Sequence, residues 1–305
     1  MSISRTQFEI LAFLERLHRN GEVKGGGITQ RVLAKQTGLS VGTVNKTLTQ
    51  LGEAALTEKN ANTITSRGIE ALEPFRVRRA VFIAAGFGSR LVPITLNTPK
   101  PLVRVRGTRI IDTLLDAAAA AEIEEIIIVR GYLGEQFDQL LYKYPSIKFL
   151  ENPFYNESNN ISSAMCVRYM LKNAYVLESD LYLNKPGIIA KYQYASNYLG
   201  VPTDLTDDWC FETRGGVISK LKVGGRNCHH MFGISYWNET DGAKMAGHIK
   251  AVYEMPGGKE RYWDQVALEY FIKEYTIEVR ECSFDDIIEI DTFKDLKKLD
   301  QSYAT

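Results

Sequence analysis

Residues 81–105 read V-F-I-A-A-G-F-G-S-R-L-V-P-I-T-L-N-T-P-K-P-L-V-R-V. The first three residues are β-branched or aromatic, and with the alanines after them they predict a buried strand. Gly86 and Gly88 follow where the strand would end, and they let the backbone come close to a ligand. Free N–H groups of such a loop attract anions, and Arg90 and Lys100 add positive charge. The stretch therefore predicts a strand followed by a polyphosphate-binding loop.

Two common phosphate motifs do not fit this stretch. It has no G-K-[ST] ending of a Walker loop, and Leu91 stands where the dinucleotide fingerprint needs a third glycine. The whole run instead resembles the signature L-A-A-G-x-G-[ST]-R-L-x-P-x-T-x-x-x-P-K-x-L of nucleotidyltransferases that make nucleoside-diphosphate sugars and CDP-alcohols. The alternative is a glycine-rich turn with incidental basic residues.

Length and charge indicate two domains. The chain has 305 residues and a net charge of zero, but residues 1–79 hold 12 Lys and Arg against 7 Asp and Glu, which leaves the rest net acidic. The four cysteines lack C-x-x-C spacing, which is typical of reduced thiols in a cytoplasmic protein. A signal peptide and a long apolar span are both missing from the sequence, so we expect no membrane association.

The first domain has the pattern of a helical DNA-binding module. Apolar spacing predicts a helix over 5–19, and Thr29 and Ser40 can cap two more. In the third helix the apolar face is Val41, Val44, Leu48 and Leu51. A hairpin over residues 56–65 and a further helix from Ser66 complete a pattern that resembles the winged helix-turn-helix domains of MarR-type regulators.

That resemblance implies DNA binding through the third helix. Thr43, Asn45 and Lys46 lie off its apolar face and would enter the major groove. Because this helix carries one cation, electrostatics alone would bind DNA weakly, and a winged helix kept for protein contacts or homodimerisation stays open. The basic run after Pro74 predicts a linker, so we place the domains at residues 1–77 and 78–305.

The second domain alternates strands and helices. Strands are expected over 81–83, 124–129, 147–150 and 174–177, and helices over 110–121, 136–142 and 162–171. This order predicts an α/β fold with a doubly wound, mostly parallel sheet, Rossmann-like, in which ligands bind at the carboxyl ends of the strands.

Carboxylates follow two of the expected strands. Asp180 comes after the strand that ends at Leu177, and Glu289 and Asp291 occupy alternate positions near the C-terminus. Mg2+ prefers one or two carboxylates together with phosphate oxygens. In the nucleotidyltransferase family a strand-end Asp and a late acidic or amide residue share the metal, and by resemblance these are Asp180 and Asp291.

All three tryptophans lie in the second half, two of them beside carboxylates in D-D-W (207–209) and Y-W-D (262–264). Aromatic faces with nearby negative charge hold quaternary ammonium groups, which cannot donate hydrogen bonds. Core packing or sugar stacking would explain each aromatic residue as well. Cys228-His229-His230 predicts no shared metal site, because neighbours on a strand point to opposite faces.

Residues 81–295 resemble the bacterial CTP:phosphocholine cytidylyltransferases. The shared motifs include G-Y-L-G-E-Q-F-D (131–138), N-P-F-Y-N-E-S-N-N-I-S-S (152–163), D-W, Y-W-D and I-I-E-I-D (287–291). The resemblance implies a trimethylammonium pocket of Trp209, Tyr262, Asp264 and Glu289. It implies a nucleotide site that includes Ala84, Ala85, Gly86, Gly88, Ser89, Gly131, Asn159 and Ser163. Leu181 departs from the family, which has Asn or Asp after the metal-binding Asp.

The expected reaction is Mg2+-dependent conversion of CTP and phosphocholine to CDP-choline and pyrophosphate. Arg90 would hold the outer phosphates, Lys100 the α-phosphate, and Asp180 the metal. The acceptor could instead be 2-aminoethylphosphonate, phosphoethanolamine or a sugar phosphate. A transcriptional regulator that senses CTP or CDP-choline is an alternative of another class.

Overall fold

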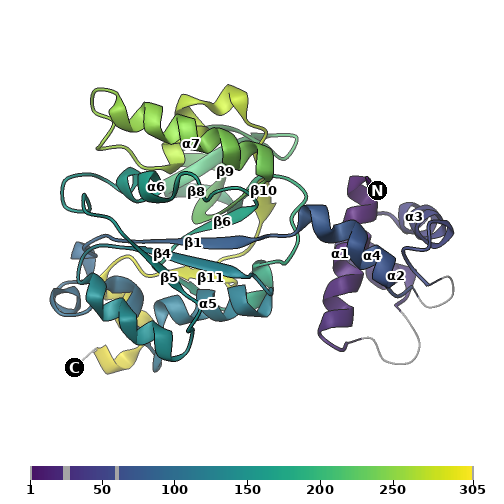
Figure 1. The fold of residues 1–305 in the computed structure, drawn as a ribbon, viewed down its shortest axis with the longest axis horizontal. Helices are drawn as coiled ribbons and strands as arrows, with labels where there is room; N and C mark the ends of the chain where they lie inside the picture. The colour runs from purple at the N-terminus through teal and green to yellow at the C-terminus, as the bar shows by residue number, and fades with distance from the viewer. Residues whose placement is uncertain (1, 23–27, 59–61, 304–305) are drawn as a thin grey trace. The chain divides into compact units, whose positions relative to one another are not determined.

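The computed structural model describes residues 2–22, 28–58 and 62–303, which form two compact units, Met1–Arg76 and Val77–Thr305 (Figure 1). The sequence predicted the boundary one residue later. Among the described residues, no helix is long and apolar enough to cross a membrane.

The first unit contains the helices α1 (Arg5–Arg19), α2 (Gln30–Thr37), α3 (Val41–Glu53) and α4 (Ser66–Leu72). Thr29 and Ser40 cap α2 and α3 as predicted, because each hydroxyl accepts a hydrogen bond from a backbone N–H three residues on. A bridge between Thr57 and Ile64 stands where the hairpin was expected, and the tip of that hairpin, residues 59–61, lies outside the described residues.

One predicted core position of α3 is wrong. Val44, Leu48 and Leu51 are buried, but Val41 is 47% exposed. Val41 is the first residue of α3, directly after the cap at Ser40, so no preceding turn covers it. The exposed side of α3 is therefore wider at its N-terminus than the apolar spacing indicated.

The second unit is built on a seven-stranded sheet with the order β10-β8-β9-β6-β1-β4-β5. Strands β6, β1, β4 and β5 run parallel, while β9 is antiparallel to β6 and to β8. The fold is thus a mostly parallel α/β sheet, as predicted. The strands are β1 (Arg79–Ala84), β4 (Glu125–Arg130), β5 (Lys148–Glu151), β6 (Ala174–Glu178), β8 (Asn197–Arg214), β9 (Val217–Trp237) and β10 (Glu278–Glu281).

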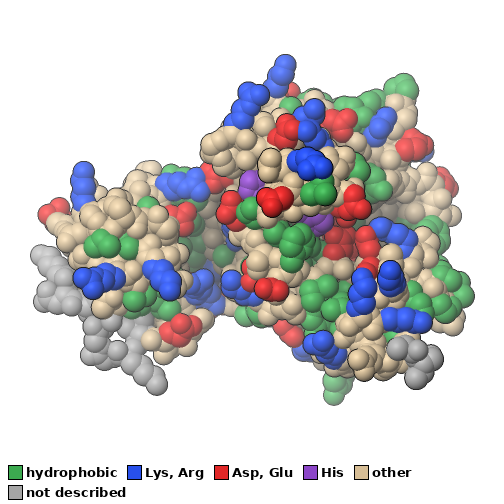
Figure 2. All heavy atoms as spheres, turned by 180° about the vertical axis from the view of Figure 1, so that it is seen from behind, with side chains coloured by type: hydrophobic (Ala, Val, Ile, Leu, Met, Phe, Trp, Pro, Cys, Tyr) green, Lys and Arg blue, Asp and Glu red, His purple; other side chains and the backbone are tan. Residues whose placement is uncertain are grey.

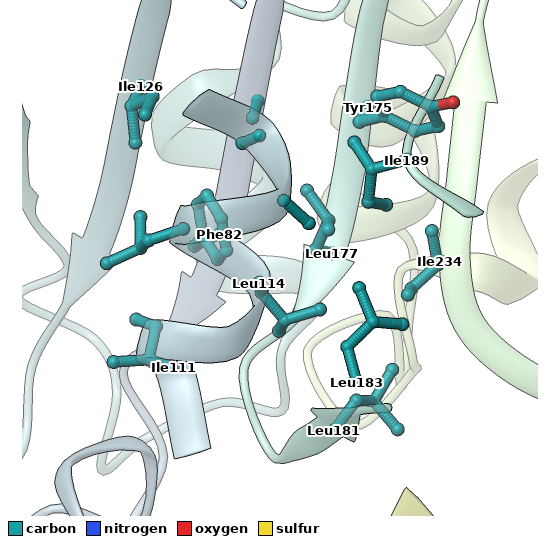
Figure 3. Packing of buried hydrophobic residues seen from close by; sticks show 14 of the residues in the cluster. Phe82, Ile111, Leu114, Ile126, Tyr175, Leu177, Leu181, Leu183, Ile189 and Ile234 are labelled. Carbon is teal, nitrogen blue, oxygen red and sulfur yellow. The ribbon is translucent and has the colours of Figure 1, made fainter. Parts of the chain in front are cut away.

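Two apolar layers cover this sheet. Alternate residues of β1 point to opposite faces, so Phe82 packs under α5 (Ile110–Ala120) while Val81 and Ile83 pack under α6 (Ile161–Val167) and α7 (Glu239–Glu254). Figure 3 shows Leu114 of α5 beside Phe82 and Leu177. Within the sheet, β1 and β6 pair in parallel, which brings the carboxyl ends of both strands to one edge.

Several predicted elements differ from the structure. Residues 134–142 form a 3-10 helix, η5 (Gly134–Tyr142), which starts after Leu133 in the left-handed region and has no side-chain cap. Helix α6 ends four residues earlier than predicted, because the Val167 carbonyl accepts from the Met170 N–H in a tighter turn. The long β8–β9 pair and the small sheet of β7 (Leu181–Leu183) with β11 (Ile287–Glu289) had not been predicted.

The remaining elements are short. Strands β2 (Arg104–Val105) and β3 (Thr108–Arg109) form a two-stranded hairpin, and α8 (Phe293–Leu299) lies near the C-terminus.

Candidate active site

The loop after β1 folds back on itself and brings Lys100 next to Gly88. Gly88 has φ +62°, and a Cβ there would lie 2.9 Å from Lys100 Cβ and 3.1 Å from Thr95 Cγ2. The Thr95 hydroxyl donates a 2.9 Å hydrogen bond to the Gly88 carbonyl. Only glycine fits this position without strain, so the second glycine of the loop is what allows the lysine to approach.

Lys100 is the centre of a buried charge cluster. Its ammonium lies 2.8 Å from Asp180 Oδ2 and 3.3 Å from Asp291 Oδ1, and the side chain is almost completely buried. Burial disfavours the charged ammonium, but the two carboxylates outweigh this and raise the pKa of Lys100. Arg90 pairs with the other oxygen of Asp291 at 2.8 Å and is largely exposed. The structure thus brings together Arg90, Lys100, Asp180 and Asp291, which lie more than 200 residues apart at the extremes.

The residues on either side of Asp180 are held by contacts with other strands. The Ser179 hydroxyl donates to the Ile83 carbonyl at 2.8 Å, which ties the end of β6 to β1. Leu181 pairs with Glu289 across β7 and β11, and its side chain is fully buried. This accounts for the departure from the family pattern, since Leu181 points into the core and not into the site.

The carboxylates fit a divalent cation. One oxygen from each of Asp180, Glu289 and Asp291 lies within 4.8 Å of the others. Asp180 Oδ1 is buried and has no hydrogen-bond partner among the described residues. A buried acceptor without a donor is costly, and a metal ion would satisfy it.

A cavity of about 250 Å3 opens beside this cluster. Its lining contains residues of the loop after β1 and of the end of β6, including Ala84, Gly86, Gly88, Ser89, Arg90, Lys100, Asn160, Glu178 and Asp180. Asn160 and Glu178 had not been predicted. Asn160 directly follows Asn159, and Glu178 directly precedes Ser179–Asp180. The sequence motifs therefore indicated the correct segments but not these two cavity-lining residues.

Comparisons with known proteins identify the family. The Nucleotidyl transferase family matches residues 79–191. The chain is 33% identical over 229 residues to a 2-aminoethylphosphonate cytidylyltransferase of Lancefieldella rimae, covering 74% of this chain and 93% of that protein. It is also 33% identical to the choline-phosphate cytidylyltransferase of Streptococcus pneumoniae, covering 73% of this chain and 97% of that protein. This chain is a nucleotidyltransferase of the cytidylyltransferase group.

A solved structure agrees with this assignment. The CTP:phosphocholine cytidylyltransferase of Streptococcus pneumoniae superposes on 74% of the chain, and on 99% of its own, with a TM-score of 0.69 and 32% identity. Residues 3–54 match a second family, described as winged helix-turn-helix DNA-binding.

Some predicted nucleotide-binding residues of this cytidylyltransferase make structural contacts. The Ala85 carbonyl accepts from the Tyr132 N–H at 3.1 Å, and the Tyr155 ring lies on Gly131, where a Cβ would come within 2.7 Å of it. The Asn159 side chain donates to the Glu260 carbonyl, and the Ser163 hydroxyl is bound by Asn152. Asn159 and Ser163 are not among the residues that line the cavity.

The predicted amine-binding residues divide into an aromatic pair and a buried acidic group. Trp209 and Tyr262 meet edge to face at 5.6 Å, and both are partly exposed. Asp264 is buried and accepts a 2.9 Å hydrogen bond from the Tyr198 hydroxyl. Trp237 and Trp263 are core residues, so Trp209 is the tryptophan able to contact a ligand.

Acidic side chains crowd this part of the cytidylyltransferase, and Figure 2 shows acidic groups gathered with histidine on one face of the catalytic unit. Burial, followed by the charges of Asp264 and Asp180, raises the pKa of Glu178 well above its ordinary value. Burial also raises the pKa of Asp264 to about 7, and burial with the charges of Asp180 and Asp291 raises that of Glu289 to about 8. Such crowding favours a cationic ligand.

Gly233 of β9 makes room for Glu178. A Cβ at Gly233 would lie 2.2 Å from Glu178 Oε2. A glycine at this position of β9 therefore leaves the space that the Glu178 carboxylate occupies.

In the N-terminal unit, Thr43, Asn45 and Lys46 are exposed on α3. The Thr43 hydroxyl lies 2.8 Å from that of Ser40, so part of its hydrogen-bonding capacity serves the helix cap.

Proposed function

We propose that this enzyme transfers the cytidylyl group of CTP to the phosphate or phosphonate of a small amine and releases pyrophosphate. The observation that carries this proposal is the Lys100–Asp180–Asp291 cluster, of which Lys100 and Asp180 line a cavity together with Gly86 and Gly88. Cations and carboxylates arranged in this way can neutralise a polyphosphate and hold a metal at the same point. The named relatives from Lancefieldella rimae and Streptococcus pneumoniae support the choice of cytidylyl transfer.

Positioning and charge neutralisation do most of the chemical work. The amides of Gly86 and Gly88, with Arg90, would hold the β- and γ-phosphates of CTP. An acceptor oxygen then attacks the α-phosphorus in line while the bond to pyrophosphate breaks. Lys100 would leave its carboxylate partners and stabilise the charge that develops on the α-phosphate.

Asp180 and Asp291 would hold Mg2+, with Glu289 close to both. When bound there, the ion would supply charge neutralisation for the phosphates. The unpartnered Asp180 Oδ1 supports this placement.

The base would lie against Ala84 and Ala85, on the side of Gly131. Asn160 lines the cavity and its amide lies 3.4 Å from Glu178 Oε1, so it is the asparagine of the 152–163 motif that we assign to this side of the site. Asn159 and Ser163 would act behind it, by holding the loop.

Two acceptors compete. The partly exposed Trp209–Tyr262 pair supports phosphocholine, since aromatic faces suit a trimethylammonium group. The relative from Lancefieldella rimae supports 2-aminoethylphosphonate. Both share a negatively charged end, a short linker and a cationic nitrogen.

A pyrophosphate-release screen tests the proposal. Each of the four nucleoside triphosphates is paired with phosphocholine, 2-aminoethylphosphonate, phosphoethanolamine and a sugar phosphate, with Mg2+ or with EDTA. We expect release with CTP and an amine acceptor, and none with EDTA. No release with CTP in any pairing would refute it.

For the N-terminal unit we propose DNA binding through α3, supported by the family match over residues 3–54 and by the exposed Thr43, Asn45 and Lys46. The protein would then be an enzyme that also regulates transcription, and not a transcriptional regulator that only senses CTP or CDP-choline. Electrophoretic shift against random duplexes at several salt concentrations tests this, because phosphate contacts make affinity fall with salt. A chain that binds no duplex would leave dimerisation as the role of this unit.

A further inference from the structure

A second group of side chains lies beside the carboxylate cluster and was not predicted. One carboxylate oxygen of Asp208, one ring nitrogen of His230 and one carboxylate oxygen of Glu289 all lie within 4.8 Å of one another. Asp208 comes from β8, His230 from β9 and Glu289 from β11. We call this group the 208–230–289 triad. Glu289 also belongs to the group with Asp180 and Asp291, so the two positions are adjacent.

The histidine of this triad is held in one orientation. Its Nδ1 lies 3.1 Å from the Thr206 hydroxyl, and its ring packs against Phe232 at 5.3 Å and Phe284 at 5.2 Å between centroids. Burial lowers the pKa of His230, although Asp208 and Asp207 oppose this. The direction of the bond between Nδ1 and Thr206 depends on the tautomer, and a neutral ring in either tautomer keeps one nitrogen as an acceptor.

The triad offers acceptors without matching donors. Among the described residues, none donates a hydrogen bond to the Glu289 carboxylate or to His230 Nε2, and Asp208 accepts through one oxygen, from the Trp209 N–H. Partly buried acceptors that lack donors favour a ligand that brings N–H groups or positive charge.

The distances among the three acceptors of the triad distinguish a primary ammonium from a trimethylammonium group. A primary ammonium donates three hydrogen bonds of about 2.8 Å in tetrahedral directions, so its acceptors stand about 4.6 Å apart. The methyl groups of a trimethylammonium keep oxygens further from the nitrogen, which spreads three acceptors to about 6 Å or more. The acceptors of the triad lie no more than 4.8 Å apart, which is too close for the second arrangement and permits the first.

We propose that His230, with Asp208 and Glu289, reads the N–H groups of a primary ammonium and makes an aminoalkyl phosphate or phosphonate the preferred acceptor. This rests on the proposed cytidylyl transfer. Because Glu289 lies in both groups, the triad is adjacent to the carboxylates assigned to the phosphate side, as an acceptor with a short linker between phosphorus and nitrogen requires. His230 is a specificity-determining residue in this scheme.

The test compares acceptors in His230→Phe, which keeps a ring between Phe232 and Phe284 but removes the acceptor nitrogen. His229→Phe is the matched control, because His229 lies next in the chain and pairs with Glu281 at 3.2 Å. His230→Gln restores an acceptor oxygen near the position of Nε2. Rates of pyrophosphate release are measured with CTP and with 2-aminoethylphosphonate, phosphoethanolamine or phosphocholine.

We expect the wild type to prefer the two primary amines. His230→Phe should lower kcat/KM for both by about 10- to 100-fold, the range for loss of one hydrogen bond to a charged group. Phosphocholine and the KM for CTP should change less than about threefold, the range of a near-neutral contact. His230→Gln should recover part of the loss, and the control variant should match the wild type.

Other outcomes overturn the inference. A wild type that prefers phosphocholine would refute the proposed selectivity. A His230→Phe variant in which kcat/KM falls equally for all acceptors would make His230 a structural residue. Tight Mn2+ or Zn2+ binding in calorimetry that His230→Phe abolishes would assign the triad to a metal. Failure of CTP with every acceptor would refute the cytidylyl transfer itself, and is thereby distinguished from a failure of selectivity alone.

Discussion

Replacing Lys100 by methionine separates the charge of this residue from its volume. One oxygen each of Asp180 and Asp291 would then face the other within 4.8 Å without a cation between them. Two unit charges about 5 Å apart at an effective dielectric constant of about 20 repel by about 3 kcal/mol. The two side chains are 23% and 21% exposed and Arg90 still pairs with Asp291, so solvent and Arg90 together reduce this to about 2 kcal/mol. For a unit of this size that corresponds to a fall in Tm of about 4 to 8 °C.

Mg2+ should reverse the loss of stability but not the loss of activity. With the lysine gone, an ion can occupy the space between the carboxylates, and saturating Mg2+ at about 100 times its Kd would return about 2.7 kcal/mol. Turnover should still fall by about two to three orders of magnitude, because the α-phosphate loses one preorganised donor. Thermal unfolding in EDTA and in Mg2+, together with pyrophosphate release, measures both effects.

Lys100→Arg and Lys148→Met serve as controls. The first keeps a cation in the cluster, and the second removes an exposed lysine whose partner is Glu125. Neither should show a Mg2+-dependent gain in Tm beyond that of the wild type. If Lys100→Met is as stable as the wild type in EDTA, or turns over normally, the assigned role of the cluster is wrong.

Three further predictions follow from the glycine loop, the aromatic pair and the buried acid. Gly88→Ala must place a side chain at φ +62° against Lys100, which should cost about 1 to 2 kcal/mol of stability and raise the KM for CTP about tenfold. The control is Gly107→Ala, at φ +86° in open space, which should destabilise the protein without changing the KM for CTP. Trp209→Ala should raise the acceptor KM by about 2- to 30-fold, the value of a cation–π contact, and leave the CTP KM unchanged; equal effects on both substrates would contradict its place in the amine pocket. Asp264 keeps its proton in the folded protein up to about pH 7, whereas the unfolded chain loses it near pH 4. The free energy of unfolding should therefore fall as pH rises through this range, by at most about 1.4 kcal/mol per pH unit, and Asp264→Asn should flatten that slope in urea titrations at pH 5 to 8.

The sequence predicted the parts of the site that one contiguous motif or one strand end contains. The loop from Gly86 to Lys100 and the position of Asp180 follow from local chemistry, because a strand, a glycine turn and a basic residue have few arrangements. The late Asp291 came from a family pattern, and the structure brings it to Lys100. Helix caps were equally local, as Ser40 shows.

Contacts between distant strands could not be predicted. His230 meets Asp208 and Glu289 only because the long β8–β9 pair and the β7–β11 sheet converge, and no spacing in the sequence encodes that. Neighbours on a strand point to opposite faces, so Cys228, His229 and His230 do not share one ion, but each can still meet side chains from other strands. Val41 was misplaced for the opposite reason, since periodicity cannot tell a helix's first residue from its interior.

The division of the site between two segments has an evolutionary consequence. The loop after β1 carries Arg90 and Lys100, to which we assign the triphosphate, whereas the β8–β9 pair carries Trp209, Asp208, His230 and Gly233, which belong to the proposed amine side. On that assignment, a substitution in the β8–β9 pair would change which amine the enzyme accepts and leave the residues for cytidylyl transfer unchanged. Acceptor selectivity would then evolve separately from the transfer reaction. Relatives equally similar to this chain bear names with different acceptors, as such a division would produce.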